Sequence, residues 1–289
     1  MTEPGRLFLV PAPLGNGDPL RILSPEVVDT IRGLRHFVVE SERSALRLLS
    51  GILPPESLRE SSFSVLDEHT DPREVPRLLE PARAGHDLGM LSEGGCPCVA
   101  DPGADLAAEA HRRGIRVIPL AGPSAILQAL MASGFSGQRF EFLGYLPARA
   151  EERRSSLKRL EREAARDGAT RIFIEAPYRG RALLSDALDV LDPETRLCVA
   201  ASLGGPEERI RSLEIRAWRT ADFRLEKELA VFLLAVSGEP GVLIGRPSGT
   251  VRGSANAVPV PAAAGTPGRR RDGRRKPDRE RPSRNPGDA

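Results

Sequence analysis

Short apolar runs alternate with helical periodicity along the first 245 residues of the chain. Runs of four or five apolar residues predict buried strands, and apolar residues three or four apart predict amphipathic helices between them. In the first half the predicted strands are 7–11, 37–40, 63–66, 87–91 and 117–120, and the predicted helices are 27–33, 44–49, 75–84 and 106–113. This alternation favours a mostly parallel sheet covered on both faces.

A second α/β unit is predicted after residue 121, where Gly-Pro-Ser interrupts the pattern and opens a helix at 125–132. Strands at 140–143, 172–175, 197–201 and 229–236 follow, with helices at 151–166 and 183–191. We therefore expect an N-terminal α/β domain at 5–121, a C-terminal α/β domain at 122–245 and a tail at 246–289.

The tail differs from the rest of the chain in charge. It has eleven Lys or Arg and four Asp or Glu, whereas residues 1–245 have 31 basic and 36 acidic residues. Large apolar residues are almost absent after Val260, and such a segment cannot bury enough apolar surface to fold. We predict a disordered basic tail that either contacts phosphates or serves only for solubility and nonspecific attraction.

Several functional classes are excluded by composition and motif. The chain is 28% charged and has no apolar run long enough for a membrane helix, and its amino terminus lacks a signal-peptide pattern, so we expect a cytoplasmic protein. Cys96 and Cys98 are too close for a Cys-x-x-Cys site, so we expect buried thiols and no metal. Dinucleotide, P-loop, metalloprotease and Gly-x-Ser-x-Gly signatures are also absent.

Four loops that follow predicted strands mix glycine with proline. They are residues 11–18, 92–103, 121–125 and 175–179. Ligands of open parallel sheets bind beyond the carboxyl ends of the strands. Glycine lets a ligand approach the backbone and proline makes the loop rigid. The pattern predicts a pocket built from main-chain groups, which suits a nucleoside.

The motifs in these loops resemble those of the tetrapyrrole methylase superfamily of S-adenosylmethionine-dependent methyltransferases. Within that superfamily they resemble those of the bacterial enzymes that 2'-O-methylate a cytidine of small-subunit ribosomal RNA. Residues 10–16 read Val-Pro-Ala-Pro-Leu-Gly-Asn, 92–103 are similar to Ser-Asp-Ala-Gly-Thr-Pro-Gly-Ile-Ser-Asp-Pro-Gly, 121–125 to Pro-Gly-Pro-Ser-Ala, and 174–179 to Tyr-Glu-Ala-Pro-His-Arg. Weaker matches are 40–43, for Glu-Asp-Thr-Arg, and 67–70, for His-Glu-His-Asn.

The resemblance implies two α/β domains with the methyl donor in the cleft between them, a homodimer, and ribosomal RNA or the small ribosomal subunit as partner. It implies that the donor is held by Leu14, Gly94, Gly95, Cys96, Val99, Ser124, Ala125, Glu175 and Leu203. A ribose hydroxyl needs a proton acceptor near neutral pH. The candidates are Glu40, Glu175 and His69, with Arg43 and Arg179 to grip phosphate or orient the carboxylates.

Several of these residues have a second interpretation. His69 is equally well explained as an exposed loop histidine, and Glu40 with Arg43 as a structural ion pair at a helix start. Four basic residues repeat every four positions on one predicted helix and form either a solvated surface or a phosphate-binding stripe. They are Arg154, Lys158, Arg162 and Arg166.

Departures from the family pattern leave the acceptor open. Ser41 and Glu42 replace Asp and Thr, Glu93 replaces Asp, and residues 202–205 replace Glu-Leu-Thr-Lys. Three readings therefore remain. They are a methyltransferase acting on ribosomal RNA ribose, a methyltransferase acting on a small molecule such as a tetrapyrrole, and a noncatalytic donor-binding or ribosome-docking protein.

Overall fold

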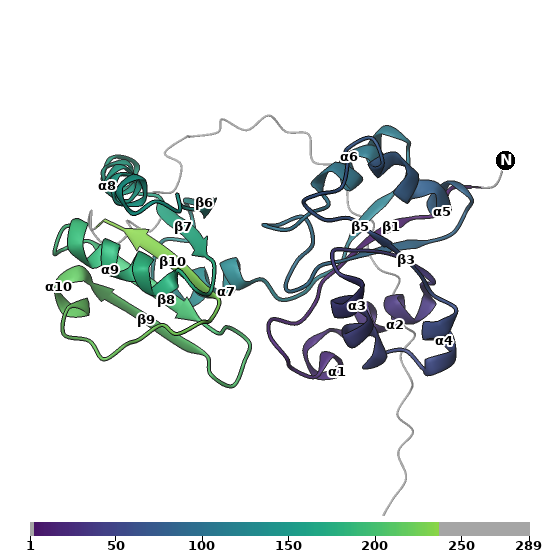
Figure 1. Ribbon diagram of the computed structural model, residues 1–289, viewed down its shortest axis with the longest axis horizontal. Helices are drawn as coiled ribbons and strands as arrows, with labels where there is room; N and C mark the ends of the chain where they lie inside the picture. Colours follow the sequence, from purple (N-terminus) through teal and green to yellow (C-terminus); the bar gives the residue numbers. More distant parts are fainter. Residues whose placement is uncertain (1–2, 237–289) are drawn as a thin grey trace, which may run out of the picture. The chain divides into compact units, whose positions relative to one another are not determined.

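The structure is a computed structural model, and it describes residues 3–236 (Figure 1). The predicted basic tail lies outside the described residues. Within them, no helix combines the length and the apolar character needed to cross a membrane.

The first sheet is parallel throughout, as the sequence predicts. Its strands are β1 (Leu7–Val10), β2 (His36–Val39), β3 (Ser62–Val65), β4 (Leu88–Leu91) and β5 (Val117–Pro119), in the order β3-β2-β4-β1-β5. All four pairings are parallel. The carboxyl ends of the five strands therefore lie along one edge of the sheet, and the loops that follow them are neighbours.

Helices cover both faces of this sheet because alternate residues of each strand point to opposite sides. On one face, α2 (Pro25–Gly33) and α3 (Glu42–Ser50) pack on Phe37 and Leu91. On the other face, α6 (Ala104–Arg112) packs on Leu7 and Met90. The short helices α1 (Pro19–Ile22) and α4 (Pro55–Arg59) were not predicted.

The prediction of a single helix at 75–84 is wrong. The segment forms a 3₁₀ helix, η1 (Val75–Leu79), followed by a short α-helix, α5 (Glu80–Arg83). Pro76 and Pro81 have no amide hydrogen to donate, so one continuous ladder of hydrogen bonds cannot run through the segment. Val75, Leu79 and Ala82 still pack into the core, as the apolar spacing indicates.

The second sheet is mixed. Its strands are β6 (Phe140–Tyr145), β7 (Thr170–Glu175), β8 (Arg196–Ala201), β9 (Arg209–Glu214) and β10 (Ala230–Ala235), in the order β6-β7-β10-β8-β9. The pairing of β6 with β7 is parallel and the other three are antiparallel. The sequence did not predict β9, because its apolar residues, Ile210 and Leu213, do not alternate with period two.

The second sheet also has two covered faces. Helix α7 (Ala125–Ser133) packs on Ile172 and Val231. On the opposite face, α8 (Ala150–Asp167), α9 (Gly180–Val190) and α10 (Ile215–Trp218) pack on Phe173 and Phe232, whose rings stack 5.8 Å apart. These two faces fix α7 and the end of β7, which both contribute to the site described next.

Candidate functional site

The loops after β1 and β4 are joined into one surface. Ala12 and Gly95 form an antiparallel bridge in which each amide donates to the other carbonyl, at N–O distances of 2.9 and 3.0 Å. The hydroxyl of the buried Ser92 donates to the Gly95 carbonyl at 2.8 Å. Because the strands hold both loops at their starts and the bridge holds them again further on, their backbone groups are fixed in place.

The loop at 92–103 turns sharply several times. Gly95 and Gly103 have φ of +83° and +123°, and Cys98 and Ala100 have φ of +66° and +63°. A side chain costs roughly 1 kcal/mol or more in this left-handed region. At Gly103, a Cβ atom would also lie 2.0 Å from Cε of Met90. The loop therefore requires glycine at that position and stores strain at the two others.

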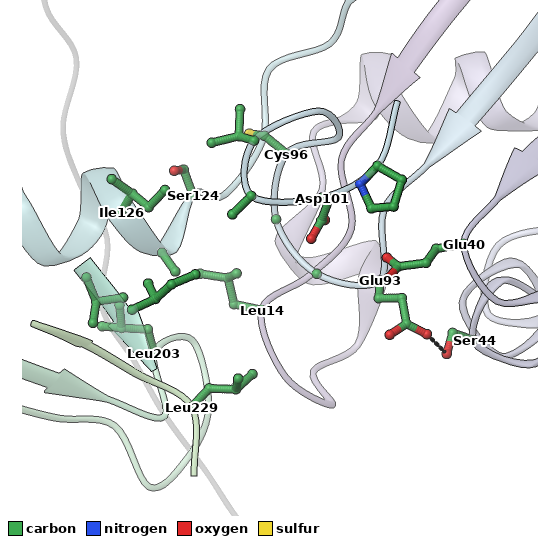
Figure 2. Close-up of a pocket in the computed structure, with 18 of the residues that line it drawn as sticks. Leu14, Glu40, Ser44, Glu93, Cys96, Asp101, Ser124, Ile126, Leu203 and Leu229 are labelled. Carbon is green, nitrogen blue, oxygen red and sulfur yellow. Dashed lines mark hydrogen bonds between the residues drawn. The ribbon is translucent and has the colours of Figure 1, made fainter. Parts of the chain in front are cut away.

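These loops line a pocket of about 1420 Å³. Its other walls come from the end of β2, the start of α7, the ends of β7 and β8, and the start of β10. Leu14 lies against the loop after β8, where a Cβ atom on Gly204 would be 3.0 Å from the Cβ of Leu14. Figure 2 shows apolar side chains, among them Leu14, Ile126 and Leu203, on one side of the pocket and Glu40, Glu93 and Asp101 on the other.

The pocket brings together all the residues that the sequence assigned to donor binding. The lining includes Leu14, Gly94, Gly95, Cys96, Val99, Ser124, Ala125, Glu175 and Leu203. Ser124 is the N-cap of α7, and its hydroxyl accepts a hydrogen bond from the Leu127 amide at 3.4 Å. Cys96 is half-buried, and its thiol donates to the Pro123 carbonyl at 3.3 Å.

The lining is strongly acidic. Within the described residues it holds nine carboxylates and no Lys, Arg or His. The carboxylates are Glu40, Asp67, Glu68, Glu93, Asp101, Asp105, Glu175, Glu207 and Glu228. A potential of this sign attracts cations and repels phosphate groups. The pocket therefore suits a positively charged ligand rather than a nucleoside triphosphate.

Two of these carboxyl groups have strongly perturbed pKa values. Burial raises the pKa of Glu40 to about 7, and Asp101, Glu93, Glu68 and Asp67 add to the rise. Burial likewise raises the pKa of Asp101 to about 6, with a further contribution from Glu93. Among residues 3–236, Oδ2 of Asp101 is buried without a hydrogen-bond partner, and no cationic group contributes to the pKa shift of either carboxyl group.

Glu175, at the end of β7, has a different environment. It is 1% exposed, and its Oε1 accepts from Nε and Nη2 of Arg179, at 2.9 and 2.6 Å, and from the Ala176 amide. Its Oε2 is buried and has no partner in the described part of the chain. Arg179 thus holds one oxygen of the carboxylate and leaves the other free for a ligand.

Three of the predicted catalytic residues do not line the pocket. Arg179 lies outside the lining and bonds to the lining residue Glu175. His69 is 83% exposed in its side chain and lies beside Glu68, and Arg43 is exposed in the first turn of α3 with no hydrogen bond or ion pair among residues 3–236. The structural ion pair between Glu40 and Arg43 that the sequence left open is not formed.

Sequence reasoning missed Asp101 and Tyr145, which both line the pocket. Asp101 lies in the 92–103 motif, so its position in that loop was the available signal. Tyr145, at the end of β6, is the aromatic residue of the lining and is 56% exposed. Burial raises the pKa of its hydroxyl, Asp101, Glu175 and Glu40 raise it further, and Arg179 partly opposes the rise.

The basic residues predicted on α8 do not form one free stripe. Arg154 makes ion pairs with Asp186 and Asp189 at 2.6 and 2.9 Å. Lys158, Arg162 and Arg166 are exposed. Among residues 3–236, no group of three or more His, Cys, Asp or Glu side chains is arranged to hold a metal ion.

Comparison with known proteins connects this pocket to a family. The family described as Tetrapyrrole (Corrin/Porphyrin) Methylases matches residues 6–217, which include both sheets except β10. The chain belongs to the tetrapyrrole methylase family. It is an S-adenosylmethionine-dependent methyltransferase, which decides against the noncatalytic reading.

Two relatives of this methyltransferase carry the same name. The chain is 35% identical to Ribosomal RNA small subunit methyltransferase I of Pseudomonas aeruginosa, over 80% of this chain and 79% of that protein. It is 31% identical to the protein of that name from Vibrio cholerae, over 79% and 76%. Among solved structures, the methyltransferase CobJ has a similar fold, with a TM-score of 0.55, 20% identity, and coverage of 82% of this chain and 98% of that one.

The pocket of this methyltransferase fits S-adenosylmethionine on three observations. The donor carries a sulfonium, and the lining is acidic. Close backbone approach is possible at Gly94 and Gly95, and Glu175 has a free buried oxygen. Drug-sized ligands occupy pockets of roughly 300–1,000 Å³, so a volume of about 1420 Å³ leaves room for an acceptor group beside the donor.

Proposed function

We propose that this methyltransferase transfers a methyl group from S-adenosylmethionine to the 2'-hydroxyl of a ribose in small-subunit ribosomal RNA. The observation that carries the proposal is the 35% identity, over four fifths of the chain, to a protein named for methylation of that RNA. The size of the pocket supports it, because donor and acceptor must be present together.

We assign donor binding to the loops that the sequence selected. Leu14, Val99 and Leu203 supply apolar contacts, and Gly94, Gly95 and Cys96 supply backbone groups of a loop held by the Ala12 bridge. Ser124 and Ala125 place the start of α7, with its free amides, at the pocket. Oε2 of Glu175 accepts a hydrogen bond from a donor or acceptor hydroxyl.

The donor supplies an activated methyl group whose sulfonium charge disappears on transfer. The protein therefore has to align the acceptor oxygen, exclude water and take up the hydroxyl proton. Glu40 and Glu175 are the predicted proton acceptors that line the pocket. Arg179 orients Glu175, which is one of the two roles proposed for it from sequence.

The acidic pocket constrains how RNA is held. Its carboxylates repel phosphate, so the target ribose enters while the flanking phosphates stay outside. We assign phosphate contacts to exposed cations beyond the lining, including Arg43 in the first turn of α3. His69 is exposed between the lining residues Glu68 and Thr70, and we assign it a contact with the same RNA segment.

The test uses the full chain, methyl-labelled S-adenosylmethionine, and small ribosomal subunits from cells that lack the gene. We expect label in the RNA. It should appear in a dinucleotide that resists alkali, because a 2'-O-methyl group blocks cleavage at that ribose. Glu175→Gln should lower the rate at least 100-fold, whereas Glu194→Gln, at an exposed loop position, should not change it.

The alternative acceptor is a small molecule such as a tetrapyrrole, and the family described as tetrapyrrole methylases favours including it. The same incubation is run with a tetrapyrrole precursor in place of ribosomes. Label in that compound with none in RNA would overturn the ribosomal assignment. Label in an RNA base rather than a ribose would overturn the assignment of the 2'-hydroxyl as the methyl acceptor.

The same family resemblance leads us to propose that the chain acts in the cytoplasm as a homodimer. Light scattering of the purified full chain should give twice its mass of 31.2 kDa. The mass of a single chain would contradict the dimer and would leave the proposed reaction unaffected.

A further inference from the structure

We propose that the ring of Tyr178 stacks on a nucleobase of the substrate RNA next to the target nucleotide and so positions the target ribose at the pocket. The inference rests on the proposed methylation of ribosomal RNA and names a residue that binds the RNA outside the donor site. Tyr178 does not line the pocket. It stands where the family motif described above has histidine.

The two tyrosines of the chain differ in exposure from its buried aromatic residues. Phe173, Phe232 and Trp218 are at most 3% exposed and belong to the core of the second sheet. Tyr145 and Tyr178, the two tyrosines of the sequence, are 56% and 73% exposed. A single exposed apolar side chain needs no explanation, whereas exposed apolar groups that gather at one place mark interaction sites.

Both tyrosines lie where the neighbouring parallel strands β6 and β7 end. Tyr145 is the last residue of β6 and pairs with Ile174 of β7, and Tyr178 follows the end of β7 by three residues. The guanidinium of Arg179 lies over the Tyr178 ring, 5.7 Å from its centroid, and bonds to the lining residue Glu175. The Tyr178 ring is therefore close to the pocket but outside its lining.

The backbone at Tyr178 is held in place on both sides. Pro177 has a fixed φ immediately before it, and the Arg179 amide donates to the Ala176 carbonyl at 2.9 Å across the turn. The Arg179 carbonyl accepts from the Leu183 amide at 3.0 Å, which joins the turn to α9. A ring on a rigid turn loses little conformational freedom when a ligand binds. Because Arg179 lies over one face of the ring, the opposite face is available for stacking.

The charge of the pocket selects a nucleobase as the ligand of this ring. The carboxylates of the lining repel phosphate, so the RNA on either side of the target ribose has to be held by groups outside the lining. Stacking on an aromatic ring is open to every base and is the usual way in which proteins bind unpaired RNA. It involves no net charge, so the carboxylates do not oppose it.

A cation for the phosphate of the stacked nucleotide lies nearby in the chain. Arg181 is exposed in the first turn of α9, three residues after Tyr178, and it has no ion pair in the part of the chain that the structure describes. Tyr178 and Arg181 thus provide the two groups that single-stranded RNA needs, an aromatic face for a base and a positive charge for its backbone.

The test compares Tyr178→Ala with the wild type, in the full chain, with methyl-labelled S-adenosylmethionine and small ribosomal subunits from cells that lack the gene. We expect KM for the subunits to rise about 10-fold, as for the loss of one stacked base, and kcat to stay within about threefold. Calorimetry with S-adenosylhomocysteine should give the wild-type dissociation constant, because the ring belongs to none of the core clusters of residues 3–236.

Three further variants separate stacking from other contacts. Tyr178→Phe keeps the aromatic face and should restore KM to within about twofold of wild type, whereas Tyr178→Leu, which is large and apolar but has no aromatic face, should resemble Tyr178→Ala. Phe140→Ala removes an exposed aromatic ring at the opposite end of β6 and is the matched control, which should retain wild-type KM and kcat.

Salt dependence separates the ring from the neighbouring charge. Tyr178→Ala should leave the slope of log KM against log salt concentration unchanged, because the lost contact is neutral. Arg181→Ala should reduce that slope by about one unit, as expected for one phosphate contact.

The inference is overturned if the wild-type chain methylates RNA and Tyr178→Ala keeps the wild-type KM, or if Tyr178→Leu restores KM as well as Tyr178→Phe does. Loss of donor binding in Tyr178→Ala would show a structural role and would also overturn it. If Tyr178→Ala fails to fold, the comparison of Tyr178→Leu with Tyr178→Phe decides, because both keep a large side chain. Absence of RNA methylation by the wild-type chain would instead refute the proposed function.

Discussion

Among residues 3–236, wholly or partly buried carboxylates occur in two contrasting environments. Around the second sheet they have arginine partners: Asp186 with Arg153, and Glu175 with Arg179. At the carboxyl edge of the first sheet, Glu40 and Asp101 have only other acids nearby. The first arrangement neutralises charge and holds helices together. The second leaves charge uncompensated, which costs stability and raises basicity.

The largest effect should follow from breaking a compensated pair. Asp186→Ala leaves Arg153 buried without its carboxylate, and such a loss costs about 3–5 kcal/mol of unfolding free energy. Urea unfolding of the variant measures the effect. Asp189→Asn removes the exposed partner of Arg154 and should cost about 0.5 kcal/mol or less. Equal losses in both variants would show that burial does not determine how much these ion pairs contribute to the unfolding free energy.

Removing an acid that has no cationic partner should raise the unfolding free energy rather than lower it. The pKa of Asp101 is raised in the folded state, to about 6, so the folded protein binds more protons than the unfolded chain between about pH 4 and pH 6. Stability therefore falls as pH rises through this window. Asp101→Asn should stabilise the protein at pH 7.5 by about 1 kcal/mol, after allowance for solvent screening, and by nothing at pH 3.5.

Thermal unfolding at the two pH values measures this difference. Glu40→Gln should also stabilise the protein, and because the pKa of Glu40 is raised to about 7, its stabilisation should keep growing up to about pH 7. Destabilisation of both variants at pH 7.5 would mean that these carboxylates are compensated, and the contrast with the second sheet would disappear.

A cation placed in the acidic pocket should weaken donor binding by a similar energy. Ser44 lines the pocket and contacts Glu93, so Ser44→Lys puts an ammonium among the unpaired acids. The dissociation constant of S-adenosylmethionine should rise about fivefold, or about 1 kcal/mol, because like charges repel. Ser50→Lys, at the exposed end of the same helix, is the control. Tighter donor binding in Ser44→Lys would contradict the electrostatic account.

The smallest effect should come from exposed basic residues on α8. Lys158 and Arg162 are solvated, so their combined replacement by alanine should change the unfolding free energy by less than about 0.5 kcal/mol. If these residues contact ribosomal RNA, the double variant should also reduce the salt dependence of RNA binding by about one unit of slope per residue. An unchanged slope would leave them as solvated surface.

The sequence predicts more of the fold than of the chemistry. Alternating apolar runs located the strands of the first sheet, and glycine and proline located the pocket loops, because both signals are local. The break at η1 was also local, through Pro76 and Pro81. By contrast, β9 pairs by antiparallel contacts with β8 and has no clear apolar face of its own.

The electrostatic character of the site could not be predicted from local patterns. Glu40 and Asp101 are about sixty residues apart and acquire their pKa values from shared burial. Tyr145 reaches the same groups from another sheet. The left-handed conformation of Cys98, where the family signature has glycine, is likewise set by the packing of the loop. Arg43 and His69 matched motifs, yet their side chains are exposed outside the lining.

The nine carboxylates of the pocket have a consequence for turnover. They attract a positively charged reactant, but the thioether left after transfer has lost that charge and gains less from them. Product inhibition should therefore be weak in this protein, and stable amine analogues that keep the positive charge should be its stronger inhibitors.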